Sequence, residues 1–86
     1  MASDHPSIVD GLDVNEVEDG LIVYDERTDR VHYLNATAAI VFTLCDGERD
    51  RDAIARAVAA AYGVGEPLGA EVDDCLDQLG REGLLR

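Results

Sequence analysis

The sequence predicts an α+β domain of the winged helix-turn-helix type, in which a three-stranded antiparallel β-meander is followed by three α-helices. Residues 13–34 contain short apolar stretches, rich in β-branched and aromatic residues and separated by polar turns, which is typical of strands. After residue 34 the apolar residues recur at spacings of three and four, as they do on one face of a helix. Because neither a meander nor a single helix can bury its apolar face alone, we expect the three helices to pack on one face of the sheet.

The strands are predicted from short apolar segments and their turns. Val14 and Val17 begin the first strand. Asp19-Gly20 predicts a primed hairpin turn, because glycine accepts the positive φ that such a turn needs. Residues 21–24 form the second strand, residues 25–29 a polar turn, and residues 31–34 the third strand.

The helix boundaries are predicted from capping residues and glycines. The expected N-caps are Asn35 and Asp50, Pro67 suits the first turn of the third helix, and the expected ends are Asp46-Gly47, Gly63 and Gly83.

Each helix has an expected inner face. These faces are Thr37, Ile40, Val41, Leu44 and Cys45 in the first helix, Ile54, Val58, Ala61 and Tyr62 in the second, and Val72, Cys75, Leu76 and Leu79 in the third. Leu84 and Leu85 are expected to fold back on the core.

The length of 86 residues fits one small domain with a single core. We expect residues 1–10 to be a flexible polar tail and residues 11–86 to be the folded domain. The sequence has no secretory signal and no apolar run of about 18 residues, so we expect neither export nor a membrane span. With two cysteines, thirty positions apart, neither a disulfide framework nor a zinc site is predicted, which favours a cytoplasmic protein.

The charge argues against binding to nucleic acid or anionic membranes. The chain has 19 acidic and 7 basic residues, all of the latter arginine, and a net charge of −12. In a DNA-binding protein of this topology the third helix would enter the major groove. Its solvent face carries five acids and one arginine, which phosphates would repel: Glu71, Asp73, Asp74, Asp77, Glu82 and Arg81.

Catalysis is not indicated. Ser3, His5 and Ser7 lie in the expected tail, and His32 lies in a strand with no metal ligand at a suitable spacing. Cys45 and Cys75 lie in apolar helical stripes, where they are expected to be small core residues. We therefore expect no enzyme activity, no metal and no cofactor.

The third strand is expected to be an edge of the sheet and is weakly protected. After Arg30 it reads Val-His-Tyr-Leu, whereas natural edges usually carry charges or proline. A partner peptide could add a strand there. Alternatively, Val31 and Tyr33 belong to the core and the edge meets solvent or a helix. The residues alone leave both alternatives open.

A resemblance to a known family is carried by residues 19–42, by Leu44-Cys-Asp-Gly and by residues 54–64 and 79–85. These segments resemble the PqqD family, and the similarity covers residues 12–86. The most distinctive parts are Leu34-Asn-Ala-Thr-Ala, at the step from strand to helix, and the Asp46-Gly47 pair after the first helix. Phe42 departs from the family pattern, in which many members carry Trp, and the loop over residues 65–69 is richer in glycine and proline than usual.

The resemblance implies the same fold and a non-catalytic function. Domains of this family bind the leader segment of a ribosomally synthesised precursor peptide and present it to a modifying enzyme. That enzyme is a radical SAM maturase in some systems and, in others, a leader peptidase (as for lasso peptides) or another maturase. The alternative is a small protein–protein interaction or regulatory module.

The family's leader adds a strand beside the third strand and packs against the third helix. The corresponding residues here are Arg30, Val31, His32, Tyr33 and Leu34 in the strand and Val72, Cys75, Leu76 and Leu79 in the helix. Some of them must face the core instead, and both a monomer and a dimer are compatible with the sequence.

Overall fold

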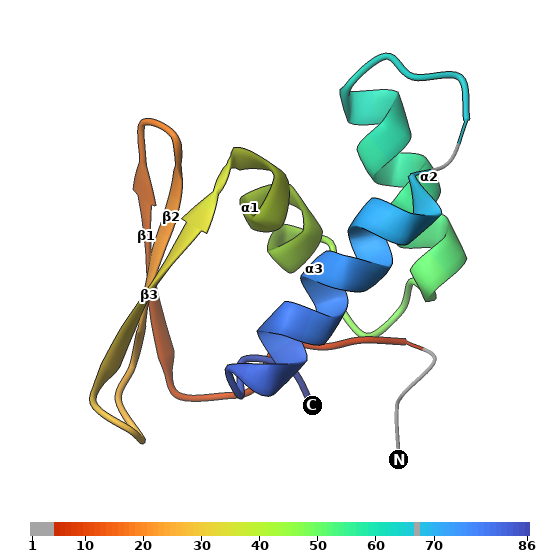
Figure 1. Ribbon diagram of the computed structural model, residues 1–86. Helices are drawn as coiled ribbons and strands as arrows, with labels where there is room; N and C mark the ends of the chain where they lie inside the picture. Colours follow the sequence, from red (N-terminus) through yellow and green to blue (C-terminus); the bar gives the residue numbers. More distant parts are fainter. Residues whose placement is uncertain (1–4, 67) are drawn as a thin grey trace.

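The computed structural model describes residues 5–66 and 68–86. Along the chain it contains β1 (Leu12–Val17), β2 (Gly20–Asp25), β3 (Arg30–Asn35), α1 (Ala36–Thr43), α2 (Arg51–Ala61) and α3 (Gly69–Arg81). The strands form one antiparallel sheet in the order β1-β2-β3 (Figure 1). The predicted meander and the three following helices are therefore confirmed. Pro67, expected in the first turn of α3, lies outside the described residues.

The first hairpin differs from the prediction in its turn. Val17 pairs with Gly20, so the two residues of the turn are Glu18 and Asp19, and Gly20 is the first residue of β2. The positive φ values of the described residues occur at four other glycines and at Asp29. The positive φ expected at Gly20 was therefore wrong. Glycine is needed there because a Cβ would lie 1.8 Å from the carbonyl oxygen of Leu34.

Two of the three helices begin at the predicted caps. The Asn35 side chain accepts a hydrogen bond from the N–H of Ala38 at 2.9 Å, and that of Asp50 accepts one from Ala53 at 2.8 Å. Asn35 is also the last residue of β3, so α1 follows the strand without a loop. At the start of α3, Leu68 occupies the N-cap position and makes no side-chain capping bond.

The three helices lie on one side of the sheet, but they do not pack on it equally. The backbone of α1 lies against β2 and β3, whereas α2 and α3 pack on each other and on α1 (Figure 1). The expectation that all three helices pack directly on the sheet is corrected: two of them are stacked behind α1. A single core joins the layers, with Val23 and Leu34 from the sheet and Phe42, Val58 and Leu76 from the helices.

The inner face of α2 is rotated from the predicted one. Ile54 and Val58 are buried as expected, but Ala61 and Tyr62 are exposed. Ala55 and Ala59 are buried instead, because small side chains allow α2 to approach its neighbours closely. In α3, Val72, Leu76 and Leu79 are buried as predicted.

Both ends of the described chain are held against the domain. Pro6 is buried, Ser7 pairs with Asp46, and Ile8 pairs with Leu85. The predicted return of Leu84 to the core is confirmed. Residues 6–9 differ from the flexible tail expected for this segment. Backbone hydrogen bonds join Ser7 and Val9 to the C-terminal residues Arg86 and Leu84, and the carbonyl of Pro6 accepts one from Gly47. Among the described helices, none has the length and apolarity that crossing a bilayer requires.

Candidate functional site

A hollow of about 470 Å³ lies between β3 and α3, and we call it the β3–α3 groove. The backbones of β3 and α3 do not pack against each other, and the beginning of α1 lies between them. Three elements therefore line the groove: Tyr33, Leu34 and Asn35 from β3, Thr37 and Ala38 from α1, and Asp74, Cys75, Gln78, Leu79 and the cap residue Glu82 from α3.

The groove lies beside an edge of the sheet. β3 is the last strand in the sheet order, and no other strand of the described chain pairs with its outer side. In an edge strand, alternate residues direct their backbone N–H and C=O groups away from the sheet. An extended peptide could pair with these groups while its side chains reach the groove.

The structure divides the nine predicted site residues into three groups. Tyr33, Leu34, Cys75 and Leu79 line the groove. Val72 and Leu76 are only 1% and 2% exposed and belong to the core, so their placement in the groove wall is corrected. Arg30, Val31 and His32 lie on β3 outside the groove lining.

Val31 and Tyr33 are the most exposed large apolar residues of β3, at 65% and 58%. They alternate with His32 and Leu34, which are more buried. Of the two alternatives that the sequence left open for Val31 and Tyr33, the core one is therefore wrong. The outward position of Tyr33 leaves it accessible at the edge of the sheet.

Prediction from sequence missed six residues of the groove, one of which is Asn35, predicted only as a helix cap. Asp74, Gln78 and Glu82 follow one another at intervals of four, a row of α3 next to the apolar stripe. That spacing was visible in the sequence. Thr37 and Ala38 line the groove because α1 starts directly after β3, and no sequence signal indicated that they face it.

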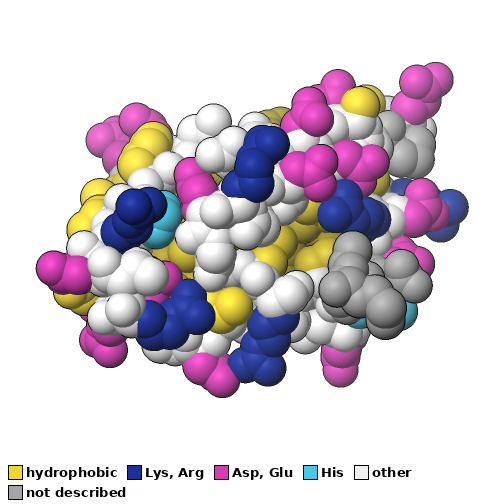
Figure 2. All heavy atoms as spheres, turned by 60° about the horizontal axis from the view of Figure 1, so that its bottom comes forward, with side chains coloured by type: hydrophobic (Ala, Val, Ile, Leu, Met, Phe, Trp, Pro, Cys, Tyr) yellow, Lys and Arg dark blue, Asp and Glu magenta, His cyan; other side chains and the backbone are white. Residues whose placement is uncertain are grey.

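The α3 wall of the groove is acidic. Arg51 contacts Asp73 at 2.9 Å and Asp77 at 3.5 Å on a neighbouring row. Within the described residues, no arginine forms an ion pair with Asp74 or Glu82. Between those two acids the wall is formed by the polar side chain of Gln78, which donates a hydrogen bond to Glu82 at 2.9 Å. In Figure 2, which shows one face of the molecule, acidic and arginine side chains surround apolar atoms that remain visible at the surface.

His32 connects the sheet with the end of α3. Its Nδ1 lies 3.5 Å from Oε2 of Glu82, and its side chain is 10% exposed. Its Nε2 is buried and has no hydrogen-bond partner among the described residues. The groove therefore ends, on the side of Glu82, at a polar contact between two different elements.

Neither cysteine is suited to nucleophilic chemistry. Burial raises the pKa of the Cys75 thiol, as does the nearby Asp74 carboxylate to a smaller extent. Burial also raises the pKa of Cys45 to about 11, and this thiol donates a hydrogen bond to the carbonyl of Val41 at 3.1 Å. Both thiols are therefore protonated at neutral pH, whereas a nucleophile is a thiolate. Cys45 is a core residue as predicted, but Cys75 lines the groove and is only partly buried.

No metal centre is formed by the part of the chain that the structure describes, since it brings together no three His, Cys, Asp or Glu side chains in an arrangement that could hold an ion.

Comparison with known proteins gives one match. The family model described as "Coenzyme PQQ synthesis protein D (PqqD)" matches residues 20–85, from the start of β2 to the segment after α3. Neither a curated protein nor a solved structure matches the chain. The matched region includes every residue that lines the β3–α3 groove. On this match over most of its length, the chain belongs to the PqqD family.

Proposed function

We propose that this protein is a non-catalytic chaperone that binds the leader segment of a ribosomally synthesised precursor peptide and presents it to a modifying enzyme, such as a radical SAM maturase or a leader peptidase. Membership of the PqqD family supports the general role, since its members are non-catalytic accessory proteins in the biosynthesis of PQQ and of ribosomally made peptides. The observation that carries the proposal is the unpaired edge of β3 beside the β3–α3 groove.

The leader would bind as a fourth strand next to β3. Each backbone hydrogen bond contributes about 0.5–1.5 kcal/mol net. An apolar leader side chain buried against Leu34 and Leu79 contributes roughly 1.5–3 kcal/mol. Ordering of a peptide that is disordered when free opposes these gains. Dissociation constants around one micromolar, about −8 kcal/mol, are the expected balance.

Charge favours a leader with a basic residue near the α3 wall. Asp74 and Glu82 line the groove, no arginine among the described residues pairs with either of them, and the whole chain carries a charge of −12. A lysine or arginine of the leader would contact one of these carboxylates. Because such contacts are exposed, binding should weaken as the salt concentration rises.

The test is a titration of the isotope-labelled protein with the leader of a precursor peptide encoded beside it, followed by amide chemical shifts. We expect saturable shifts at residues 30–38 and 74–82, together with slower hydrogen exchange at alternate residues of β3. Shifts confined to other surfaces would refute the groove as the site. No binding, with or without the neighbouring enzyme, would favour the alternative of a general interaction module.

Two pairs of variants separate contact with the groove from loss of fold. Gln78→Trp fills the groove from an exposed position and should abolish binding, whereas Gln78→Ala should not. Asp74→Arg reverses one of the charges of the wall and should weaken the binding of a basic leader. Glu48→Arg makes the same charge change away from the groove and serves as its control. Equal affinities within each pair would contradict the proposed site.

A further inference from the structure

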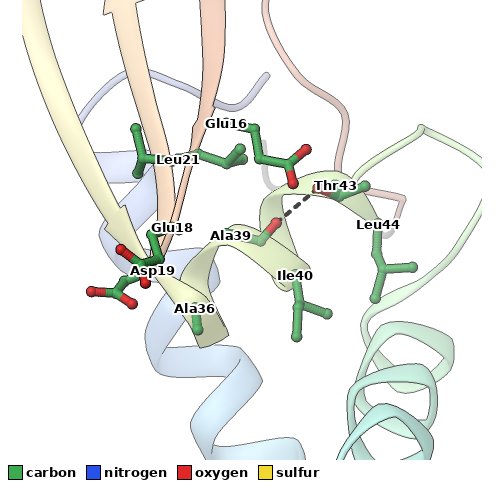
Figure 3. Close-up of a pocket in the computed structure, with 11 residues that line it drawn as sticks. Glu16, Glu18, Asp19, Leu21, Ala36, Ala39, Ile40, Thr43 and Leu44 are labelled. Carbon is green, nitrogen blue, oxygen red and sulfur yellow. Dashed lines mark hydrogen bonds between the residues drawn. The ribbon is translucent and has the colours of Figure 1, made fainter.

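A second hollow, of about 400 Å³, lies between the β1–β2 hairpin and α1, and we call it the hairpin hollow (Figure 3). It is separate from the β3–α3 groove, because α1 stands between the two. Thr37 and Ala38 line the groove, whereas Ala39, Ile40 and Thr43 line the hairpin hollow. The two sites can therefore be occupied at the same time.

The floor of the hairpin hollow is apolar. It is formed mainly by Leu21 on β2 and by Ala39, Ile40 and Leu44 on and after α1. These four residues pack against the core from one side and are only partly buried. Their other side is left uncovered by the described chain, so an inserted apolar side chain would be removed from water without displacing any part of the fold.

The rim of the hairpin hollow is acidic. Glu16 lies on β1, and Glu18 and Asp19 form the turn. In Figure 3 the Glu16 carboxylate points toward α1, whereas those of Glu18 and Asp19 lie at the tip of the hairpin and point away from α1. None of the three forms an ion pair with a described arginine, and no basic residue lines the hollow.

We propose that the hairpin hollow binds one aliphatic side chain projecting from a basic segment of a second protein, whose flanking lysine or arginine residues pair with Glu16, Glu18 and Asp19. The apolar floor contributes affinity through burial, and the acidic rim selects basic partners and speeds association. The protein would then hold two partners on opposite sides of α1, the peptide at β3 and a second protein at the hairpin.

Charge complementarity excludes the other occupants. A second copy of this chain carries a charge of −12 and would place acidic surface against the acidic rim. An anionic lipid surface is repelled for the same reason. A leader paired with β3 lies across α1 from the hollow.

The probe is the capped peptide acetyl-Arg-Leu-Arg-amide, titrated into the full isotope-labelled chain. We expect saturable amide shifts at Gly20, Leu21, Ile40 and Thr43. Acetyl-Arg-Gly-Arg-amide, which lacks the apolar side chain, and acetyl-Glu-Leu-Glu-amide, which lacks the basic ones, should not produce them. Absence of saturation, equal binding of either control, or shifts at the β3–α3 groove alone would overturn the proposal. So would the same shifts on concentrating the protein alone, since they would indicate a second copy.

Variants at the rim test the charge argument in a folded protein. Thr43→Arg places a cation at the rim, on an exposed position in the last turn of α1 where a cation suits the helix dipole. It should lower the affinity for the probe peptide about fivefold, whereas Thr43→Gln should not. Glu18→Gln removes one rim carboxylate and should weaken binding about two- to fivefold. Glu48→Gln removes a carboxylate that does not line the hollow and should have no effect on binding of the probe. Unchanged affinity in Thr43→Arg and Glu18→Gln would exclude the proposed pairing.

Discussion

The imidazole of His32 on β3 faces the carboxylate of Glu82 just after α3, with 3.5 Å between Nδ1 and Oε2. The contact links two elements whose backbones do not pack together. On its other side, Nε2 of His32 is buried and has no hydrogen-bond partner within residues 5–66 and 68–86, and an unsatisfied buried polar atom is costly. The contact therefore defines one end of the β3–α3 groove more than it stabilises the fold.

Replacement of His32 by phenylalanine should leave stability unchanged or raise it by up to about 1 kcal/mol, because the ring keeps its packing and the unsatisfied nitrogen is removed. His32→Ala should destabilise by about 1–3 kcal/mol, because it removes the ring and its packing. Urea unfolding at pH 7 measures both. If His32→Phe is the more damaging of the two, the buried Nε2 makes a polar interaction that stabilises the folded protein.

Asp25 should make the protein sensitive to acid. Its side chain is 1% exposed and forms a bidentate ion pair with Arg27, at 3.0 Å to Nε and 2.9 Å to a terminal nitrogen. These hydrogen bonds lower the pKa of Asp25 below its ordinary value of 3.8. The unfolded chain then binds a proton before the folded one does, so the stabilisation is present above about pH 4 and is lost as the pH falls through the folded-state pKa.

Asp25→Asn should therefore unfold at lower urea concentration than the parent at pH 7. The difference between the two proteins should shrink below pH 3. A gap that stays constant from pH 7 to pH 2.5 would show that Asp25 is not the acid-sensitive group.

Two glycine substitutions should have opposite effects. Gly20→Ala places a Cβ 1.8 Å from the Leu34 carbonyl oxygen and forces β2 and β3 apart, at a cost of about 1–3 kcal/mol. Gly80→Ala adds a methyl group inside α3, where no described atom outside the neighbouring residues and local helix backbone lies within 4 Å. It should stabilise the protein by about 0.5–1 kcal/mol. Thermal melts of the two variants check both signs. A stabilised Gly20→Ala would contradict the close approach of Gly20 to the Leu34 carbonyl.

Neighbouring residues of α3 should separate stability from binding. Leu76→Ala removes a side chain that is 2% exposed and should cost about 2–5 kcal/mol of stability. Cys75→Ala lies on the groove side and should cost less than about 1 kcal/mol, while reducing affinity for the leader. Urea unfolding and leader titration on the same samples test the assignment. It fails if Cys75→Ala is the more destabilising variant.

The two thiols should differ in reactivity. Cys75 is partly exposed and Cys45 is buried, so a maleimide should label Cys75 first in the folded protein. Because the pKa of Cys75 is raised, its labelling should be slow at pH 7 and should still be accelerating above pH 9. Bound leader should protect Cys75. Rapid labelling of Cys45 before unfolding would contradict its position in the core.

Much of the fold was predictable because its signals are local. Asn35 and Asp50 cap helices through bonds to residues three positions ahead. The glycines at 63 and 83 follow helices in the left-handed conformation. Turn chemistry was less predictable, since Gly20 is required by a contact with β3 and not by its own φ.

The candidate site was predictable only in part. The sequence by itself determined the order of strands and helices, the acidic surface and the apolar stripe of α3, because periodicity and charge are carried by neighbouring residues. It did not determine that Leu76 faces the core while Cys75 faces the groove. Nor did it place α1 between two hollows. Those features depend on how α2 and α3 stack behind α1, and that arrangement is set by packing between residues far apart in the chain.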